Sequence, residues 1–436
     1  MAWIEHWEPE DPSFWERTGR RIAVRNLWYS IFVEHVGFSV WTLWSVFVLF
    51  MGPEYGVDAA GKFFLVSTAS LVGAVLRVPY TFAVARFGGR NWTVISALLL
   101  LVPTVAAAFV LKPGTPYGTF VLMAALAGFG GGNFASSMTN INTFFPEGRK
   151  GLALGLNAGG GNIGVAVVQL VGLLVIAAAG VGRPWLLLAV YIPLIVVSAV
   201  CAALFMDNLV TVRNDTGAAR EALADPHTAV MSVLYIGTFG SFIGYSFAFG
   251  LVLQNQFGRT PLQAAAVTFL GPLLGSLVRP VGGWLADRVG GARVTYWNFL
   301  LMGAATAVCI AASSPALFTA GFIGLFVFSG VGNGSTYKMI PAIFRAKELA
   351  ASNGGAEPDL GRARRVSGAA IGIISAVGAL GGLLINLAFR QSFAATGGGV
   401  PAFWAFLACY LACAVLTYLV YGASREPARA PAYAGV

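Results

Sequence analysis

Twelve long apolar segments constrain the fold of this chain more than any other feature. They cover residues 27–52, 61–84, 92–111, 119–145, 149–176, 183–206, 229–254, 262–286, 293–312, 317–345, 366–392 and 400–423. Each is long enough to cross about 30 Å of hydrocarbon as a helix. Every backbone amide in lipid needs a partner within the protein, so helices are the form expected for spans of this length. The sequence therefore predicts an all-α, polytopic protein with twelve transmembrane helices in a lipid bilayer.

The composition supports a membrane protein. Charged residues make up 10% of the chain and apolar residues 57%, whereas about a quarter of a typical soluble domain is charged. A disordered protein, an ordinary soluble enzyme and a nucleic-acid binder are therefore excluded, in spite of the net charge of +9. The spans hold no nucleophile–base pair and no cysteine or histidine spacing typical of a metal site. We expect no enzymatic activity, no cofactor and no metal.

Lysine and arginine are distributed unequally between the two sets of connections. One set holds nineteen of them, namely 17, 20, 21, 25, 86, 90, 149, 150, 213, 220, 288, 293, 345, 347, 362, 364, 365, 425 and 429. The other set holds five, namely 62, 112, 183, 259 and 390. Basic residues collect on the cytoplasmic side of membrane proteins. The counts predict a multi-pass protein of the cytoplasmic (inner) membrane with both termini in the cytoplasm.

The chain divides into two halves that share one plan. We expect a cytoplasmic segment at 1–26, six-helix bundles at 27–206 and 229–423, a cytoplasmic central loop at 207–228 and a cytoplasmic tail at 424–436. LVGAVLRVPYTFAVARFGG, which begins at Leu71, resembles LLGSLVRPVGGWLADRVGG, which begins at Leu273. Two pseudo-symmetric bundles are typical of secondary transporters, which bind substrate between their repeats.

The second copy of this repeat carries a loop motif. Gly283, Asp287, Arg288 and Gly290 resemble the conserved cytoplasmic loop of the major facilitator superfamily. The first copy departs from that motif, with alanine at positions 83 and 85. We expect Asp287 and Arg288 to act in conformational change and the loop-to-helix charge contacts to be stronger in the second half.

Ionisable residues inside the spans are few. Arg77 and Arg279 occupy equivalent positions in the two repeats, Lys338 is the third cation, and Glu34 is the carboxylate of comparable depth, followed by His35. An arginine at the centre of a membrane costs about 3 kcal/mol or more. A surplus of cations favours binding of an anion, and a guanidinium holds an oxyanion by two parallel hydrogen bonds. Alternatively, the arginines snorkel to the cytoplasmic interface.

Polar and aromatic residues accompany the arginines. Tyr235 and Phe239 are four residues apart and share a helix face, while spans four and five contribute Asn133, Phe134, Asn157 and Asn162. These side chains suit a flat, delocalised anion, although an aromatic residue in a span more often serves packing.

Glycine is frequent in spans five and eleven. The glycines expected to allow close helix approach and sliding are Gly155, Gly159, Gly161, Gly164, Gly372, Gly378 and Gly381. No strand precedes these runs, so a phosphate-binding loop is not indicated.

Nearly the whole chain resembles the NarK-type nitrate/nitrite porters of the major facilitator superfamily. The resemblance includes GFGGGNFASSMTNINTFFPEGRKGLALGLNAGGGNIG from Gly128 and GPLLGSLVRPVGGWLADRVGG from Gly271. It implies alternating access, a monomer, and nitrate and nitrite as substrates. It further implies that Arg77 and Arg279 clamp the anion, that Phe134 and Phe239 flank it, and that Tyr235 and Asn162 donate hydrogen bonds to it.

The mode of coupling is a separate question. The exchanger branch of the family has no ionisable residue at the positions of Glu34, His35 and Lys338. Anion uptake against a negative-inside potential costs about 2.3 kcal/mol per charge per 100 mV. We hypothesise that Glu34 or His35 takes up protons, with Lys338 as partner, which gives nitrate/proton symport. The alternatives are nitrate/nitrite antiport without protons, with a static Glu34–Lys338 bridge, and a nitrate-sensing receptor without flux.

Overall fold

The computed structural model describes residues 3–210, 214–352 and 358–422. Within these residues, twelve helical segments are long and apolar enough to cross a membrane. They run over Pro12–Phe50, Ala59–Phe87, Gly89–Val110, Tyr117–Phe144, Gly148–Ala179, Trp185–Phe205, Pro226–Phe257, Pro261–Val289, Gly291–Ala311, Pro315–Ala351, Leu360–Thr396 and Val400–Gly422. The predicted fold class is confirmed. Arg213 and the expected tail at 424–436 lie outside the described residues.

Breaks and tight turns divide several of these segments into separate elements. The helices are α1 (Pro12–Phe14), α2 (Arg20–Thr42), α3 (Trp44–Phe50), α4 (Ala59–Phe87), α5 (Gly89–Leu99), α6 (Leu101–Val110), α7 (Tyr117–Ala127), α8 (Phe129–Phe144), α9 (Glu147–Ala179), α10 (Trp185–Phe205), α11 (Thr216–Ala224), α12 (Pro226–Tyr235), α13 (Ser241–Phe257), α14 (Pro261–Thr268), α15 (Leu270–Val289), α16 (Gly291–Ala311), α17 (Pro315–Ser352), α18 (Leu360–Thr396) and α19 (Val400–Thr417). Wider π-helical turns lie at η1 (Trp15–Gly19), η3 (Ile236–Gly240) and η4 (Tyr418–Gly422), and a 3₁₀ turn at η2 (Pro53–Tyr55).

The repeated loop has the same backbone form in both copies. Gly88 ends α4 with φ of 88°, and Gly290 precedes α16 with φ of 90°. A residue with a Cβ rarely adopts a positive φ, so glycine is required at both positions. The two glycines are equivalent in the repeat seen in the sequence.

The described residues group into two compact units. The first unit comprises Met1–Asn214, Ser246–Leu273 and Phe389–Gly397, and the second comprises Asp215–Tyr245, Leu274–Ala388 and Gly398–Val436. In the first unit α2 packs against α8, α9 and α10, and α4 packs against α7 and α8. In the second unit α16 packs against α17 and α19. The predicted boundaries of the two bundles stay a prediction.

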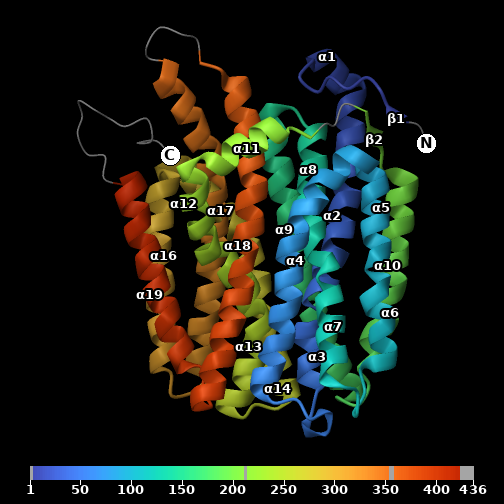
Figure 1. Cartoon of the computed structure of the whole chain (residues 1–436), viewed down its shortest axis with the longest axis vertical. Coiled ribbons are helices and arrows are strands. Elements are labelled where there is room, and N and C mark those ends of the chain that lie inside the picture. The colour runs from blue at the N-terminus through green and yellow to red at the C-terminus, as the bar shows by residue number, and fades with distance from the viewer. Residues whose placement is uncertain (1–2, 211–213, 353–357, 423–436) are drawn as a thin grey trace. The chain divides into compact units, whose positions relative to one another are not determined.

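An N-terminal segment is anchored to the first unit, which the sequence did not indicate. Strand β1 (Trp3–Ile4) pairs in parallel with β2 (Asn208–Leu209), and Figure 1 shows the two side by side near the N-terminus. The Trp7 indole donates a hydrogen bond to the carbonyl oxygen of Thr143 at 3.2 Å. Its ring packs edge-on against Phe144. The segment therefore covers the C-terminal end of α8.

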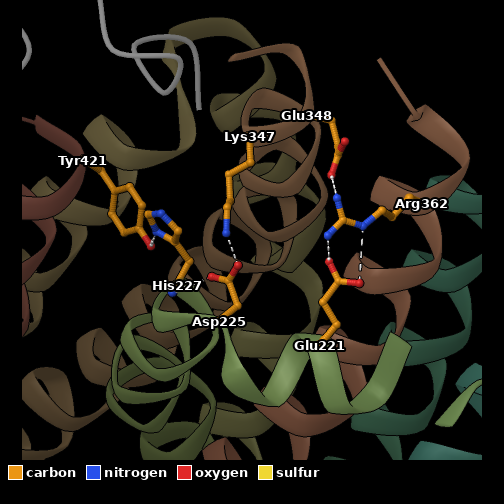
Figure 2. A network of polar contacts seen from close by, with 7 residues as sticks. All are labelled: Glu221, Asp225, His227, Lys347, Glu348, Arg362 and Tyr421. Atoms are coloured by element: carbon orange, nitrogen blue, oxygen red, sulfur yellow. Dashed lines mark hydrogen bonds and ion pairs between the residues drawn. The ribbon is translucent and has the colours of Figure 1, made fainter. Parts of the chain in front are cut away.

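A charged network joins α11 to the ends of α17 and α18 within the second unit (Figure 2). The guanidinium of Arg362 bridges Glu221 at 2.5 Å and Glu348 at 3.0 Å. Lys347 pairs with Asp225. Lys347 and Glu348 lie in polar helical turns at the C-terminal end of α17, and Arg362 lies in such a turn at the N-terminal end of α18. Both helices therefore continue beyond the apolar segments predicted from the sequence.

Candidate functional site

Arg77 is completely buried in the first unit. Its side chain is 0% exposed, and its Nε donates a hydrogen bond to the carbonyl oxygen of Gly131 at 3.3 Å. The guanidinium lies 4.5 Å from the ring centroid of Phe134 and 5.6 Å from that of Trp41. A snorkelling arginine would instead extend its head group to the surface. The burial favours an internal role for Arg77.

Arg279 has a matching environment in the second unit. It is 6% exposed on α15, and its Nη2 donates a hydrogen bond to the Tyr235 hydroxyl at 3.4 Å. The guanidinium lies 5.5 Å from the ring centroid of Tyr337. Its Nη1 is buried and has no hydrogen-bond partner among the described residues. A buried guanidinium nitrogen of this kind is a donor available to an anion.

Tyr235 and Phe239 form one aromatic face, as their spacing predicted. Their rings are stacked, with centroids 5.3 Å apart and an interplanar angle of 8°. The π-helical turn η3 begins directly after Tyr235. The structure thus brings Arg279, Tyr235 and Phe239 together in the second unit, and Arg77 and Phe134 together in the first.

Three asparagines singled out from the sequence are buried in the first unit. Neither polar side-chain atom of Asn162 or of Asn133 has a partner among the described residues. Asn157 instead contacts Glu34, with its Nδ2 donating to Glu34 Oε2 at 2.7 Å. Asn162 and Asn133 therefore retain hydrogen-bonding capacity that a ligand or water can use.

Glu34 accepts hydrogen bonds from two neutral side chains, Ser137 and Asn157. The Ser137 hydroxyl donates to Glu34 Oε2 at 2.6 Å, and it also exchanges a hydrogen bond with Ser30 at 2.8 Å. His35, the next residue, places its Nδ1 3.2 Å from the carbonyl oxygen of Gly160. A carboxylate that is almost completely buried is a candidate for a functional role because burial of its charge is costly.

The structure gives Lys338 an ion partner that the sequence did not predict. Its Nζ lies 2.9 Å from Oδ1 of Asp287, and the lysine side chain is 48% exposed. Asp287 belongs to the repeated loop, and Arg288 beside it stacks 4.1 Å from the Trp284 ring centroid. Asp287 lies in the last turn of α15, so the pair joins α15 to α17. The expected difference in charge contacts between the two halves stays a prediction. The interaction of Lys338 with Glu34 stays a prediction.

Four of the predicted glycines allow close helix approach, in two repeat-related pairs. A Cβ added at Gly161 would collide with the Glu34 carboxylate, and one at Gly164 with the His35 carbonyl. In the second unit, a Cβ at Gly378 would collide with the Tyr235 ring, and one at Gly381 would lie 2.6 Å from Gly240 Cα. At Gly155, Gly159 and Gly372 no described heavy atom lies within 4 Å of such a Cβ. The proposed sliding motion stays a prediction.

Sequence reasoning missed three contacting residues, Trp41, Ser137 and Tyr337. Trp41 faces Arg77 from α2, and Tyr337 faces Arg279 from α17. Tyr337 directly precedes Lys338, so its position beside a charged residue was the one available signal. Trp41 and Ser137 have no distinguishing pattern in a chain that is rich in aromatic and small residues.

Comparison with known proteins agrees with this architecture. The family model of the Major Facilitator Superfamily matches residues 30–354. The nitrate/nitrite transporter NarU of Salmonella typhimurium is 41% identical, over 97% of this chain and 97% of its own. The probable nitrate/nitrite antiporter NarK2 of Thermus thermophilus is 33% identical, over 99% of this chain and 98% of its own. A bacterial homolog of the human lysosomal transporter Spinster, solved in an inward-facing and occupied conformation, has a TM-score of 0.65 at 17% identity, covering 90% of this chain and 95% of that one.

The fold and the family match place the chain in the major facilitator superfamily, and it is a multi-pass membrane protein. The matches to named nitrate/nitrite transporters, at 41% and 33% identity over nearly the whole chain, define the family more specifically. The chain belongs to the NarK-type nitrate/nitrite porter family of that superfamily.

Proposed function

We propose that this protein transports nitrate and nitrite across the cytoplasmic membrane by alternating access, with Arg77 and Arg279 binding the same anion. The observation that carries the proposal is the occurrence of one buried arginine in each unit, at repeat-equivalent positions, each against aromatic rings. The substrate class, nitrate and nitrite, is taken from the names of the two relatives described above.

The surroundings of the arginines suit a small planar oxyanion. Phe134 lies against Arg77, and the stacked pair of Tyr235 and Phe239 lies beside Arg279. Aromatic faces flank a flat anion, while guanidinium, hydroxyl and amide groups donate hydrogen bonds in its plane. Asn162 supplies the amide donor in this proposal, because both of its polar atoms lack a described partner.

We orient both termini toward the cytoplasm. The connections on that side carry most of the lysine and arginine residues, including the α4–α5 loop with Arg86 and Arg90. The ends of α17 and α18, where Lys347 and Arg362 make their ion pairs, then lie on the same side.

For coupling we favour nitrate/proton symport. Uptake of an anion into a negative-inside cell needs a compensating charge. Glu34 is a buried carboxylate within the first span, and His35 follows it in the sequence. The static-bridge alternative requires Lys338 to neutralise Glu34, yet Lys338 forms an ion pair with Asp287.

Antiport of nitrate against nitrite is the second candidate. The Thermus thermophilus relative carries the name of an antiporter, and equal charges moving in opposite directions need no protonatable group. Under this alternative Glu34 is a structural residue.

Reconstituted liposomes with independent control of the pH gradient and of internal nitrite separate the two modes. Symport predicts nitrate accumulation that follows the pH gradient in nitrite-free vesicles, and a Glu34→Gln variant weakens this accumulation more than nitrate/nitrite exchange. Antiport predicts that accumulation requires internal nitrite and ignores the pH gradient. Equal effects of Glu34→Gln on both activities, or none, would remove Glu34 from the coupling mechanism.

A further inference from the structure

A small polar cavity lies beside Glu34 inside the first unit. It is formed by α2, α5 and α8, and the lining residues are Ser30, Val33, Glu34, Thr93, Ser96, Asn133, Ser136 and Ser137. Seven of these eight side chains are polar, and none is an arginine. The volume of about 10 Å³ corresponds to a site for roughly one water molecule. Arg77 is not among the residues that line this cavity.

Asn133 indicates that the cavity takes a polar guest. The side chain is 2% exposed, lines the cavity, and has neither its Nδ2 nor its Oδ1 paired with a described residue. A buried polar group without a partner costs about 1–3 kcal/mol. Water in the cavity would supply both a donor and an acceptor. Buried waters typically make about three hydrogen bonds to groups of this kind.

We propose that this cavity holds water and forms the route by which the coupling proton leaves Glu34 for the cytoplasm during nitrate uptake. The inference deepens the proposed function and rests on it, because it names the site at which the coupling proton is bound. In this step the protonated Glu34 carboxylic acid gives its proton to the cavity water, which leaves an ionised carboxylate and a hydronium ion that passes to the cytoplasm.

The hydrogen bonds of Glu34 accommodate both protonation states. Ser137 gives its hydroxyl proton to Glu34, so its oxygen accepts from Ser30 and from Asn157 Nδ2, the latter at 2.6 Å. This arrangement offers two donors to an ionised carboxylate. When the carboxylate is protonated, its hydroxyl needs an acceptor. Asn157 Oδ1 is buried without a described partner and can serve as that acceptor.

Two neutral side chains donate hydrogen bonds to the Glu34 carboxylate. Ser137 from α8 and Asn157 from α9 contact its carboxylate. The buried titratable groups on the packed helices are Arg77 and Tyr80 on α4 and Tyr191 on α10, while His35 on α2 is half-buried. The other charged groups of these helices lie toward their ends, and they are Arg20, Arg21 and Arg25 on α2, Lys62 and Arg86 on α4, Arg90 on α5, and Glu147, Arg149 and Lys150 on α9. Arg77 is directed to Phe134 and Gly131, and His35 to the Gly160 carbonyl. Glu34 is the one carboxylate among the residues of these helices that are described as buried.

The cavity lies near the end of α5 that we place in the cytoplasm. Helix α5 begins at Gly89, directly after the repeated loop. Thr93 and Ser96 line the cavity, and they lie four and seven residues after Gly89, the first residue of α5. At 1.5 Å per residue these positions are about 6 and 10 Å from the start of the helix. A proton released by Glu34 therefore has a short polar path to the cytoplasm.

One turn of α8 serves both the cavity and the arginine. Asn133, Ser136 and Ser137 line the cavity, whereas Phe134 contacts the Arg77 guanidinium. Ser137 and Phe134 are three residues apart, so a change in the hydrogen bonds of Ser137 when Glu34 loses or gains a proton reaches the ring against Arg77 within one turn of helix. This shared turn supplies a physical link between proton binding and anion binding.

Two variants of similar shape at Ser96 test the water route. Valine and threonine have the same shape, and they differ only in that valine has a methyl group where threonine has a hydroxyl. Ser96→Val and Ser96→Thr therefore narrow the cavity equally, but only Ser96→Thr keeps a polar side chain in its wall. In sodium-free liposomes we would measure nitrate accumulation under a pH gradient of one unit, divided by the rate of labelled-nitrate counterflow. One proton per anion supports roughly tenfold accumulation per pH unit.

We expect this ratio to stay within twofold of wild type in Ser96→Thr and to fall at least fivefold in Ser96→Val. An equal ratio in the two variants overturns the proposal, whatever its value. Nitrate accumulation by the wild type that follows a sodium gradient at constant pH also overturns the proposal, because sodium rather than a proton would then be the coupling ion. Absence of counterflow in wild type would refute the transport function itself, whereas counterflow with equal ratios refutes only the water route.

Discussion

Replacement of Arg77 by lysine is the perturbation whose effect the structure defines best. Lysine keeps the positive charge but loses the planar fork that gives two parallel hydrogen bonds to an oxyanion. One hydrogen bond to a charged group contributes about 1.5–3 kcal/mol. Since 1.4 kcal/mol corresponds to a factor of ten, Arg77→Lys should raise the half-saturating nitrate concentration by roughly 10- to 150-fold.

The assay is the concentration dependence of labelled-nitrate counterflow in liposomes. Arg86→Lys is a matched control on the same helix, because Arg86 is exposed and its guanidinium lies 5.7 Å from the Phe87 ring centroid. We expect that control to remain within twofold of wild type. Both variants should show an unchanged unfolding temperature in detergent, within a few degrees. A half-saturating concentration for Arg77→Lys within threefold of wild type would refute the proposed role of the guanidinium.

Three further predictions concern packing and surface charge. Gly161→Ala should lower the unfolding temperature in detergent and reduce transport, because the added Cβ would collide with Glu34. Gly155→Ala is the control and should be tolerated, because its Cβ meets no described atom. Equal effects of the two substitutions would contradict the packing of α9 on α2. Trp7→Ala should destabilise the protein by about 3 kcal/mol in denaturant titration, because it removes a buried indole, and an unchanged midpoint would show that the N-terminal segment is not anchored. Arg362→Ala should cost at most about 1 kcal/mol, since its ion pairs are solvent-exposed; a larger loss of stability would indicate that the network acts cooperatively.

Hydropathy predicted the twelve spans because hydrocarbon burial requires about 20 apolar residues in a row. It did not predict where helices end outside that region. The first helical segment begins at Pro12 rather than near residue 27, and α18 begins at Leu360 rather than near residue 366. Polar turns there are stabilised by local hydrogen bonds and by ion pairs such as Arg362 with Glu221. The β1–β2 pairing was missed because each strand has two residues and no pattern.

The sequence identified the buried arginines through their cost in lipid and their repetition. Partners across helices were harder to predict, because contact depends on helix rotation as well as depth. Lys338 was grouped with the cations inside the spans, yet it pairs with Asp287, a residue 51 positions earlier in the chain. Asn157 was expected near the anion, but it donates to Glu34. Both contacts depend on which face of a helix meets its neighbour. Hydropathy does not determine the rotation of a helix about its own axis when the helix is rich in glycine, because glycine has no side chain to distinguish one face from another.

The measurement that tests the central claim most directly is counterflow of labelled nitrate into liposomes loaded with unlabelled nitrite. The wild-type protein should accumulate label transiently above the level in protein-free liposomes. The Arg77→Lys/Arg279→Lys double variant, purified with an unchanged unfolding temperature, should lose this accumulation. Label uptake by the wild type no greater than in protein-free liposomes, or equal accumulation by the double variant, would contradict transport through a site built on the two arginines.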